Sequence, residues 1–206
     1  MKLNNNDRNI VEMYQKMGIG YLQDIKNIVT PEFLYFLKII RKGGRVLDVG
    51  CAGGRDCGAL TKKGFKAVGI DLVDVFLKEA KRLTPKAKFV RMDLLNLKFP
   101  ANYFDAIWAN AVLHHFNKKD LPAIFKDFYR VLRPGGKLYI QTKQGRGLVY
   151  RKDRFSQLKR PFLLLLKKDL SKHASSAGFR IRFIKTVNDA AERKNVKWLA
   201  LLAEKK

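Results

Sequence analysis

Cysteine and acidic residues are scarce in this 206-residue chain, and long apolar runs are missing. The only cysteines, Cys51 and Cys57, lack the C-x-x-C spacing of zinc and redox motifs, so we predict neither a disulfide framework nor a metal site. The longest purely apolar run, residues 198–203, is far shorter than the roughly 20 residues that span a bilayer. The first residues have no apolar core of a secretory signal. These absences predict a soluble, cytoplasmic protein without a membrane span.

The scarcity of acids leaves a large positive charge. The chain has 43 Lys and Arg residues against 18 Asp and Glu residues, which gives a formal net charge of +25. Such an excess predicts attraction to polyanions, so nucleic acid is one candidate partner. A basic bias spread over many proteins of one source would give the same count without any such partner. Both interpretations stay open at this point.

Short apolar runs alternate with helical segments from Arg45 onward. The predicted strands cover residues 45–50, 66–71, 88–93, 104–112 and 137–142, with predicted helices at 53–63, 74–83 and 118–132. This alternation predicts βαβ units and an α/β fold with a parallel sheet. A further helix at 167–177 precedes two runs, 179–187 and 196–203, that could pair antiparallel at the sheet edge. Before the sheet, residues 7–41 are predicted to be helical, with a break at Gly18 and a restart at Thr30-Pro31.

A glycine-rich loop follows the first predicted strand, from Asp48 to Gly54. Ligands of parallel sheets bind at the carboxyl ends of the strands, so we expect this loop to meet a ligand, although it could also serve as a tight turn. Asp71 ends the second predicted strand, about 20 residues later, where an acid can accept hydrogen bonds from ribose hydroxyls. Asp93 ends the third, where a side chain can reach an adenine.

The loop fits neither of two phosphate-binding patterns. Counted from Gly50, Ala52 and Arg55 occupy the other glycine positions of G-x-G-x-x-G, and no P-loop sequence is present. A carboxylate such as Asp48 would repel a pyrophosphate and attract a cation. The expected ligand is therefore a nucleoside that carries a positive charge.

Six segments carry a resemblance to a known family: VLDVGCAGGRD (46–56), VGIDL (68–72), RMDLLNLKFP (91–100), FDAIWANAVLHHF (104–116), VLRPGGKLYI (131–140) and SSAGF (175–179). On these the chain resembles the class I S-adenosylmethionine-dependent methyltransferases, and is similar to the small ubiquinone/menaquinone-biosynthesis type. The resemblance implies one domain over 1–206, with a helical lid at 1–43 and a Rossmann-like core at 44–206. It also implies three αβα layers around a mostly parallel seven-stranded sheet with an antiparallel C-terminal edge hairpin.

The implied cofactor is S-adenosylmethionine, with S-adenosylhomocysteine as product. The resemblance assigns the cofactor to Tyr14, Tyr21, Asp48, Gly50, Cys51, Ala52, Gly53, Gly54, Asp71, Leu72, Asp93, Leu94, Ala109 and Asn110. Asp48 and the loop backbone would surround the methionine part, and Asp71 would hold the ribose. Asp93 and the Leu94 main chain would face the adenine.

Other positions are expected nearer to the methyl group. Ala109 and Asn110 would line the sulfonium side of the pocket. Tyr14 and Tyr21 resemble aromatic residues of the family's lid, where a cation–π contact and plain core packing are both reasonable. Ala52 stands where the family usually has glycine, which carries a conformational cost if the site needs a positive φ.

Methyl transfer from a sulfonium expels a neutral thioether, so it depends mostly on positioning. A base is needed only if the acceptor must lose a proton. His114, His115 and Asn110 are the candidate catalytic residues, with the alternative that one histidine packs and the other is solvated. Cys51 lies in the cofactor loop with no base near it in sequence, so we do not expect a nucleophile there.

The resemblance places the basic stretch between Lys143 and Lys172 beside the acceptor. Its other basic residues include Arg146, Arg151, Lys152, Arg154, Lys159, Arg160, Lys167 and Lys168. A basic wall suits an acidic small molecule or RNA. We predict a methyltransferase with a small-molecule acceptor; the alternatives are a tRNA methyltransferase and a non-catalytic RNA-binding module. Residues 162–166 could be buried, form an apolar acceptor pocket, or make a dimer contact, so monomer and dimer both stay open.

Overall fold

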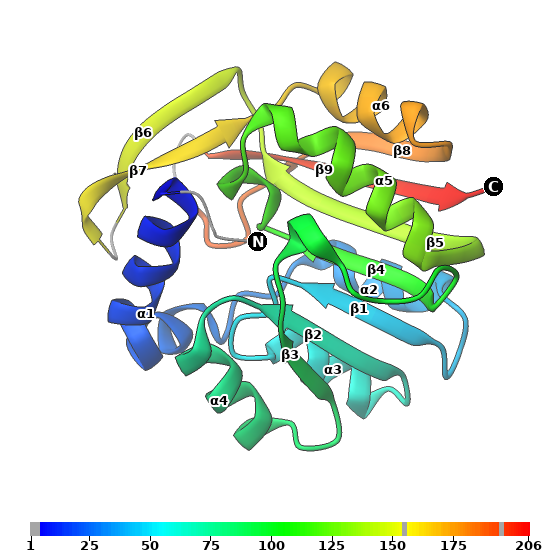
Figure 1. Cartoon of the computed structure of the whole chain (residues 1–206), viewed down its shortest axis with the longest axis horizontal. Helices are drawn as coiled ribbons and strands as arrows, with labels where there is room; N and C mark the ends of the chain where they lie inside the picture. The colour runs from blue at the N-terminus through cyan, green and yellow to red at the C-terminus, as the bar shows by residue number, and fades with distance from the viewer. Residues whose placement is uncertain (1–4, 154–155, 194–195) are drawn as a thin grey trace.

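The computed structural model describes residues 5–153, 156–193 and 196–206 (Figure 1). The helices are α1 (Asn5–Ile25), α2 (Pro31–Ile39), α3 (Arg55–Lys62), α4 (Asp74–Leu83), α5 (Leu121–Val131) and α6 (Lys167–Ser176), with 3-10 helices η1 (Leu94–Asn96), η2 (Leu113–His115) and η3 (Lys118–Asp120). The strands are β1 (Arg45–Val49), β2 (Lys66–Asp71), β3 (Lys88–Arg91), β4 (Phe104–Asn110), β5 (Leu132–Lys143), β6 (Gly147–Asp153), β7 (Ser156–Leu164), β8 (Phe179–Asn188) and β9 (Lys197–Lys205).

Seven strands form the main sheet, in the order β3-β2-β1-β4-β5-β9-β8. The first five run parallel, and β9 pairs antiparallel with both β5 and β8. The predicted mostly parallel sheet with an antiparallel edge hairpin is therefore confirmed. Strand order reverses between β1 and β4, and the carboxyl ends of strands at such a reversal are where ligands bind in this architecture.

Helices cover both faces of the sheet because neighbouring strand residues point in opposite directions. On β1, Leu47 packs with the cluster that contains α5 and α6, whereas Val46 packs with the cluster that contains α2 and α3 (Figure 1). The apolar residues of α5 recur at helical spacing, and Ile124, Phe125 and Phe128 are completely buried. The three αβα layers follow from these two apolar faces.

The N-terminal helix α1 lies over the carboxyl ends of the strands, and α2 packs on one face of the sheet. The break predicted at Gly18 is a kink inside α1, with φ 55° and ψ −143°. Thr30 precedes α2 as predicted, but its side chain makes no capping bond, and its hydroxyl oxygen instead accepts from Asn110 Nδ2 at 3.1 Å. None of the helices in the described part of the chain is long and apolar enough to cross a membrane.

A second, two-stranded sheet of β6 and β7 was not predicted. It lies beside α1 and contacts η2 and β5 (Figure 1). Pro161, which pairs with Tyr150, argues against a strand in the sequence because proline has no backbone N–H to donate to a neighbouring strand. It is tolerated only at sheet edges or bulges. Of residues 162–166, Phe162, Leu163 and Leu165 are buried, which agrees with the first of the three alternatives.

Candidate functional site

Two adjoining cavities lie at the carboxyl ends of the parallel strands. The large cavity has a volume of about 800 Å³ and the small cavity about 140 Å³. Both are bordered by Tyr14, Tyr21, Gly50, Ala52 and Ala111. The glycine-rich loop and the N-terminal helix α1 therefore meet where the two cavities join.

The end of β2 fixes the glycine-rich loop. The Gly50 and Cys51 N–H groups both donate to the Ile70 carbonyl, at 2.9 and 3.0 Å, and the Ala52 N–H donates to Asp71 Oδ2 at 2.9 Å. Gly50 and Ala52 have φ values of 68° and 45°, so the positive φ suspected at Ala52 is present. A left-handed conformation is expensive for a residue with a Cβ, and Ala52 is therefore strained.

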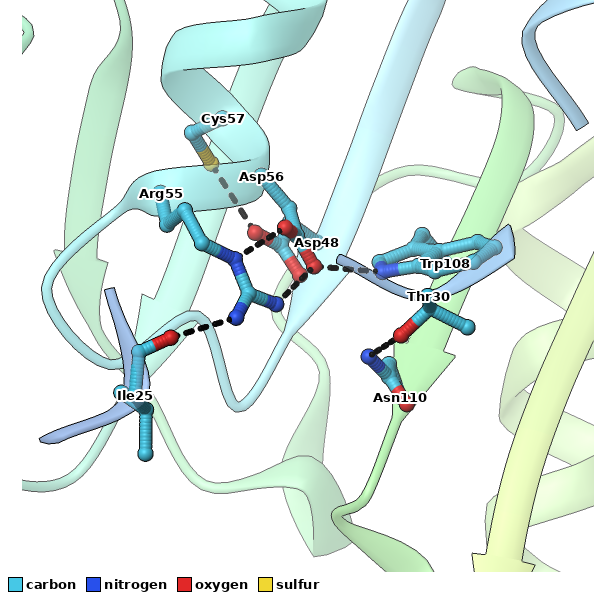
Figure 2. A network of polar contacts seen from close by, with 8 residues as sticks. All are labelled: Ile25, Thr30, Asp48, Arg55, Asp56, Cys57, Trp108 and Asn110. Carbon is cyan, nitrogen blue, oxygen red and sulfur yellow. Dashed lines mark hydrogen bonds and ion pairs between the residues drawn. The ribbon is translucent and has the colours of Figure 1, made fainter. Parts of the chain in front are cut away.

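Asp48 is buried, with 3% of its surface exposed, and borders the large cavity. Cys57 Sγ donates to its Oδ2 at 3.3 Å (Figure 2). Burial, followed by the nearby Asp56, raises the pKa of Asp48 to about 8. The free site thus holds a neutral carboxylic acid at neutral pH, and a ligand cation would favour its ionised form.

Arg55 ties the loop to the N-terminal helix. Its Nε and a terminal nitrogen donate to the two Asp56 oxygens at 2.7 and 3.1 Å, and its other terminal nitrogen donates to the Ile25 carbonyl at 3.0 Å (Figure 2). Trp108 Nε1 also donates to Asp56, at 2.9 Å. One half-buried acid, Asp56, thereby joins α3 to β4 and, through Arg55, to the end of α1.

Asp71 accepts three backbone hydrogen bonds, from Ala52, Leu72 and Val73, at 2.9, 2.8 and 3.0 Å. Burial raises its pKa, and these three bonds act in the opposite direction. With Leu72 and Leu94, Asp71 borders the small cavity. The carboxylate is therefore held rigidly at the wall of a cavity that is otherwise largely apolar.

Three predicted cofactor residues border neither cavity in the described structure. Asp93 Oδ1 accepts from the Leu95 N–H at 2.9 Å, so this side chain caps η1. Ala109 is completely buried in the core. Gly54 has φ 74° and is packed so tightly that a Cβ would lie 2.8 Å from Phe89. Asp93 was expected at a strand end, but β3 stops at Arg91 and the next residues turn into η1.

Of the other predicted cofactor residues, Cys51 and Gly53 border the large cavity. A Cβ on Gly53 would lie 2.9 Å from Leu22, which shows how closely α1 covers the loop. Tyr14 and Tyr21 contact each other, with ring centroids 5.0 Å apart, and Tyr21 stacks on Phe76. The two tyrosines therefore both pack together and face the cavities, so the two expectations for them do not exclude each other.

The candidate catalytic residues divide between the cavities. Asn110 and His114 border the large cavity, and His115 borders the small one, with Nε2 3.2 Å from the Tyr14 hydroxyl. Burial, followed by nearby cationic side chains, lowers the pKa of His115 to about 3. Burial and His115 lower the pKa of His114 well below its ordinary value. Both rings are neutral at pH 7 and are weak bases.

Part of the predicted basic wall faces the large cavity. Lys143, Arg151, Lys152 and Arg160 border it. Arg146, Lys159, Lys167 and Lys168 are not among its lining residues, and Arg154 lies outside the described residues.

Sequence reasoning missed several lining residues. Ala111 follows β4 with φ 59° and donates its N–H to the Gln141 carbonyl, and Gln141 also borders the large cavity. Trp198 comes from β9, which lies between β5 and β8, and Phe162 comes from the unpredicted β7. No sequence pattern marks a left-handed alanine, whereas the apolar run at 162–166 did point to a pocket as one alternative.

Comparison with known proteins bears on this site. Residues 47–140 match the family model described as "Methyltransferase domain". The chain is 36% identical over 104 residues to sterol 24-C-methyltransferase erg6 of Aspergillus fumigatus, covering 47% of this chain and 27% of that protein. It is 33% identical over 136 residues to phosphoethanolamine N-methyltransferase 3 of Arabidopsis thaliana, covering 64% and 27%. The matches thus span about a quarter of the length of these curated relatives.

Solved structures share the fold. A methyltransferase of Methanosarcina mazei, described as S-adenosylmethionine-dependent, superposes with TM-score 0.76 at 19% identity, covering 86% of this chain and 98% of that one. The 1,6-didemethyltoxoflavin-N1-methyltransferase of Burkholderia thailandensis, solved with 1,6-didemethyltoxoflavin and S-adenosylhomocysteine bound, superposes with TM-score 0.71 at 18% identity, covering 100% and 92%. At these identities the likeness concerns the fold.

Replacing Ala52 with glycine is expected to raise the free energy of unfolding by roughly 0.5–1 kcal/mol. The left-handed φ costs alanine about 1–2 kcal/mol, and glycine removes this strain. Glycine also has greater conformational entropy in the unfolded chain, which offsets part of the stabilisation. Urea denaturation measures the change. As a control, Ala123→Gly on the exposed side of α5 should lose about 1 kcal/mol. A loss of stability in Ala52→Gly would contradict the strain.

Replacing Asp48 with asparagine is expected to stabilise the ligand-free protein at pH 8–9 by at least about 1 kcal/mol. The folded pKa is raised to about 8, so the stability that Asp48 contributes is complete below its unfolded pKa near 4 and is lost as pH rises through 8. Thermal unfolding of both proteins from pH 4 to 9 measures the difference, which should vanish at the acid end. The exposed control Asp24→Asn should show no such dependence on pH.

Proposed function

We propose that this chain is an S-adenosylmethionine-dependent methyltransferase and that it transfers the methyl group to a small-molecule acceptor. The match of residues 47–140 to the model described as "Methyltransferase domain" and the shared fold support this. The observation that carries the proposal is the pair of carboxyl groups, buried Asp48 and half-buried Asp71, beside the strained loop residue Ala52. Asp48 lies on β1, where the strand order reverses, and Asp71 ends the neighbouring strand β2.

The residues present fit the cofactor. Asp71 offers a rigid carboxylate for ribose hydroxyls, beside apolar Leu72 and Leu94, which suit a flat base. Asp48 offers a buried acid to the large cavity, where a ligand cation would repay the cost of ionising it. The positive φ of Gly50 turns the backbone between the two acids.

When bound, S-adenosylmethionine supplies a methyl group on a positively charged sulfur, whose departure as a neutral thioether needs no acid. The chain's own task is to position the reactants and exclude water. Tyr14, Tyr21 and Leu22 on α1 cover the loop, and Arg55 fastens the end of α1 to it. Holding reactants near contact distance supplies roughly 7–11 kcal/mol of the barrier in well-oriented systems.

The histidines are poorly suited to remove a proton at neutral pH. The pKa of His115 is lowered to about 3 and that of His114 well below its ordinary range. We assign them to the cavity walls, where neutral rings stack and shape the space, and Asn110 to holding Thr30 of the lid region. The acceptor is then one whose reacting atom needs no strong base.

A small acceptor is supported by the enclosed setting of the site and by the relatives. The large cavity lies within the volume range of small-molecule sites, roughly 300–1,000 Å³. The names of the two curated relatives give a sterol and phosphoethanolamine as the acceptors of those proteins. The net charge of +25 and the basic residues at the large cavity suit RNA as well, but they suit an acidic small molecule equally.

Removing the carboxylate of Asp71 is expected to weaken binding of S-adenosylhomocysteine at least tenfold, about 1.4 kcal/mol. Isothermal titration calorimetry of wild type and Asp71→Ala measures this. The matched control is Asp93→Ala, which should bind nearly as tightly as wild type because Asp93 caps η1 and borders neither cavity. No heat from the wild type at high micromolar ligand would contradict the proposed function.

A methyl-transfer screen is expected to identify a small product. Purified protein with tritiated S-adenosylmethionine and fractionated cell extract should label a low-molecular-weight fraction, and ribonuclease treatment should leave the label unchanged. Scintillation counting after size fractionation measures both arms. Label that stays with RNA and disappears after ribonuclease, together with tRNA binding that falls steeply with salt, would favour an RNA acceptor instead.

A further inference from the structure

The wall of the large cavity that β5, β7 and β9 supply carries cations beside aromatic rings. Lys143 ends β5, Arg160 and Phe162 lie on β7, and Trp198 lies on β9; all four border the cavity. Resting on the function proposed above, we infer that the methyl acceptor is a small organic anion. Lys143 and Arg160 hold its charged group, and its apolar or planar body lies against Phe162 and Trp198.

The cations and the rings are close together. Lys143 Nζ lies 5.0 Å from the ring centroid of Phe162 and 4.6 Å from that of Trp198. Arg160 Cζ lies 4.7 Å from the same Phe162 ring and 5.0 Å from the ring of Tyr14. Two positive charges therefore share one aromatic ring, and a ligand that reaches this ring meets both of them.

The acids of the cavity are engaged elsewhere. Asp189 accepts from Arg193 at 2.6 Å and from Trp198 Nε1 at 2.7 Å, and Asp56 accepts from Arg55. Among the described side chains, residues 8–152, 159–193 and 196–206, no carboxylate lies within ion-pair distance of Lys143. Asp189 attracts the Lys143 charge from a greater distance, so the direct ion pair is left for a ligand to make.

The cost of keeping Lys143 charged in this wall is visible, because burial, followed by the charge of Arg193, lowers its pKa to about 8. A bound anion would relieve this cost, because an opposite charge within a few ångströms favours the charged form of lysine. The rings of Phe162 and Trp198 would contact the apolar part of the acceptor.

The anion site lies next to the end of β4. The His114 ring is 5.5 Å from Phe162 and 5.6 Å from Trp198, centroid to centroid. His114 and Asn110 border the same cavity as Asp48 and the glycine-rich loop. A small acceptor held by Lys143 would therefore share the cavity with the cofactor residues, which is what direct transfer requires. The acceptor class that fits is a carboxylate or phosphate monoester on an aromatic or otherwise apolar body.

Competitive acetylation of the full-length protein tests the site directly. A lysine with a pKa near 8 is about one quarter neutral at pH 7.5, far more than an ordinary lysine, so Lys143 should be acetylated faster than exposed Lys126 on α5. With S-adenosylhomocysteine present, phenyl phosphate or benzoate should slow acetylation of Lys143 at least fivefold and leave Lys126 unchanged, as measured by mass spectrometry. Inorganic phosphate, which lacks the body, should protect less. The two organic probes separate a phosphate from a carboxylate.

Variants show whether the charge is responsible. Lys143→Met should weaken phenyl phosphate or benzoate binding at least tenfold, Lys143→Arg should restore most of it, and Lys126→Met should change nothing. Affinity for S-adenosylhomocysteine should stay within threefold of wild type in all three, as measured by calorimetry, which also shows that each variant is folded.

Three outcomes would overturn the inference. The first is that Lys143→Met weakens the binding of S-adenosylhomocysteine and not that of the anions, which would mean that Lys143 serves the cofactor. The second is that transfer RNA protects Lys143 from acetylation and neither small anion does. The third is that neither anion protects Lys143 although S-adenosylhomocysteine binds; the proposed function would then still stand. If the wild type binds no S-adenosylhomocysteine, the proposed function fails first.

Discussion

Three backbone N–H groups converge on the carboxylate of Asp71, and this convergence holds the glycine-rich loop against the end of β2. Without it, the Ala52 N–H would have no partner, and nothing would offset the strain of its positive φ. The cover of α1 over Gly53 depends on where the loop lies. The rigid carboxylate of Asp71 therefore helps to fix the backbone where the two cavities join.

The fold was largely predictable because parallel strands covered on both faces must be apolar almost throughout. β1 and β4 stand out for this reason, and the glycines after β1 mark where the chain turns toward a ligand. The β6–β7 hairpin was not predictable, since Pro161 and several charges interrupt the alternation that identifies a strand. Residues 133–136, with Pro134 and two glycines, lie inside β5, where its pairing with β4 shifts.

The candidate site was only partly predictable. Asp48, Asp71 and the loop lie where their spacing predicted, because each follows directly from a strand end. Asp93 lies at the start of η1 because β3 ends early, and alternation turns the Ala109 side chain into the core; their contact with the cofactor stays a prediction. Lys143 and Trp198 meet only through the pairing of β5 with β9, a contact between distant segments that no local pattern encodes.

The neutral form of Asp48 gives the large cavity a property of its own. In the free protein a proton balances this buried carboxyl group, and a positively charged ligand would take over that task. When such a ligand binds, its positive charge replaces the proton of Asp48, which is released to the solvent. The net charge of the cavity therefore does not change. The affinity for such a ligand should therefore increase as pH rises. The binding enthalpy measured by calorimetry should include the heat of protonating the buffer.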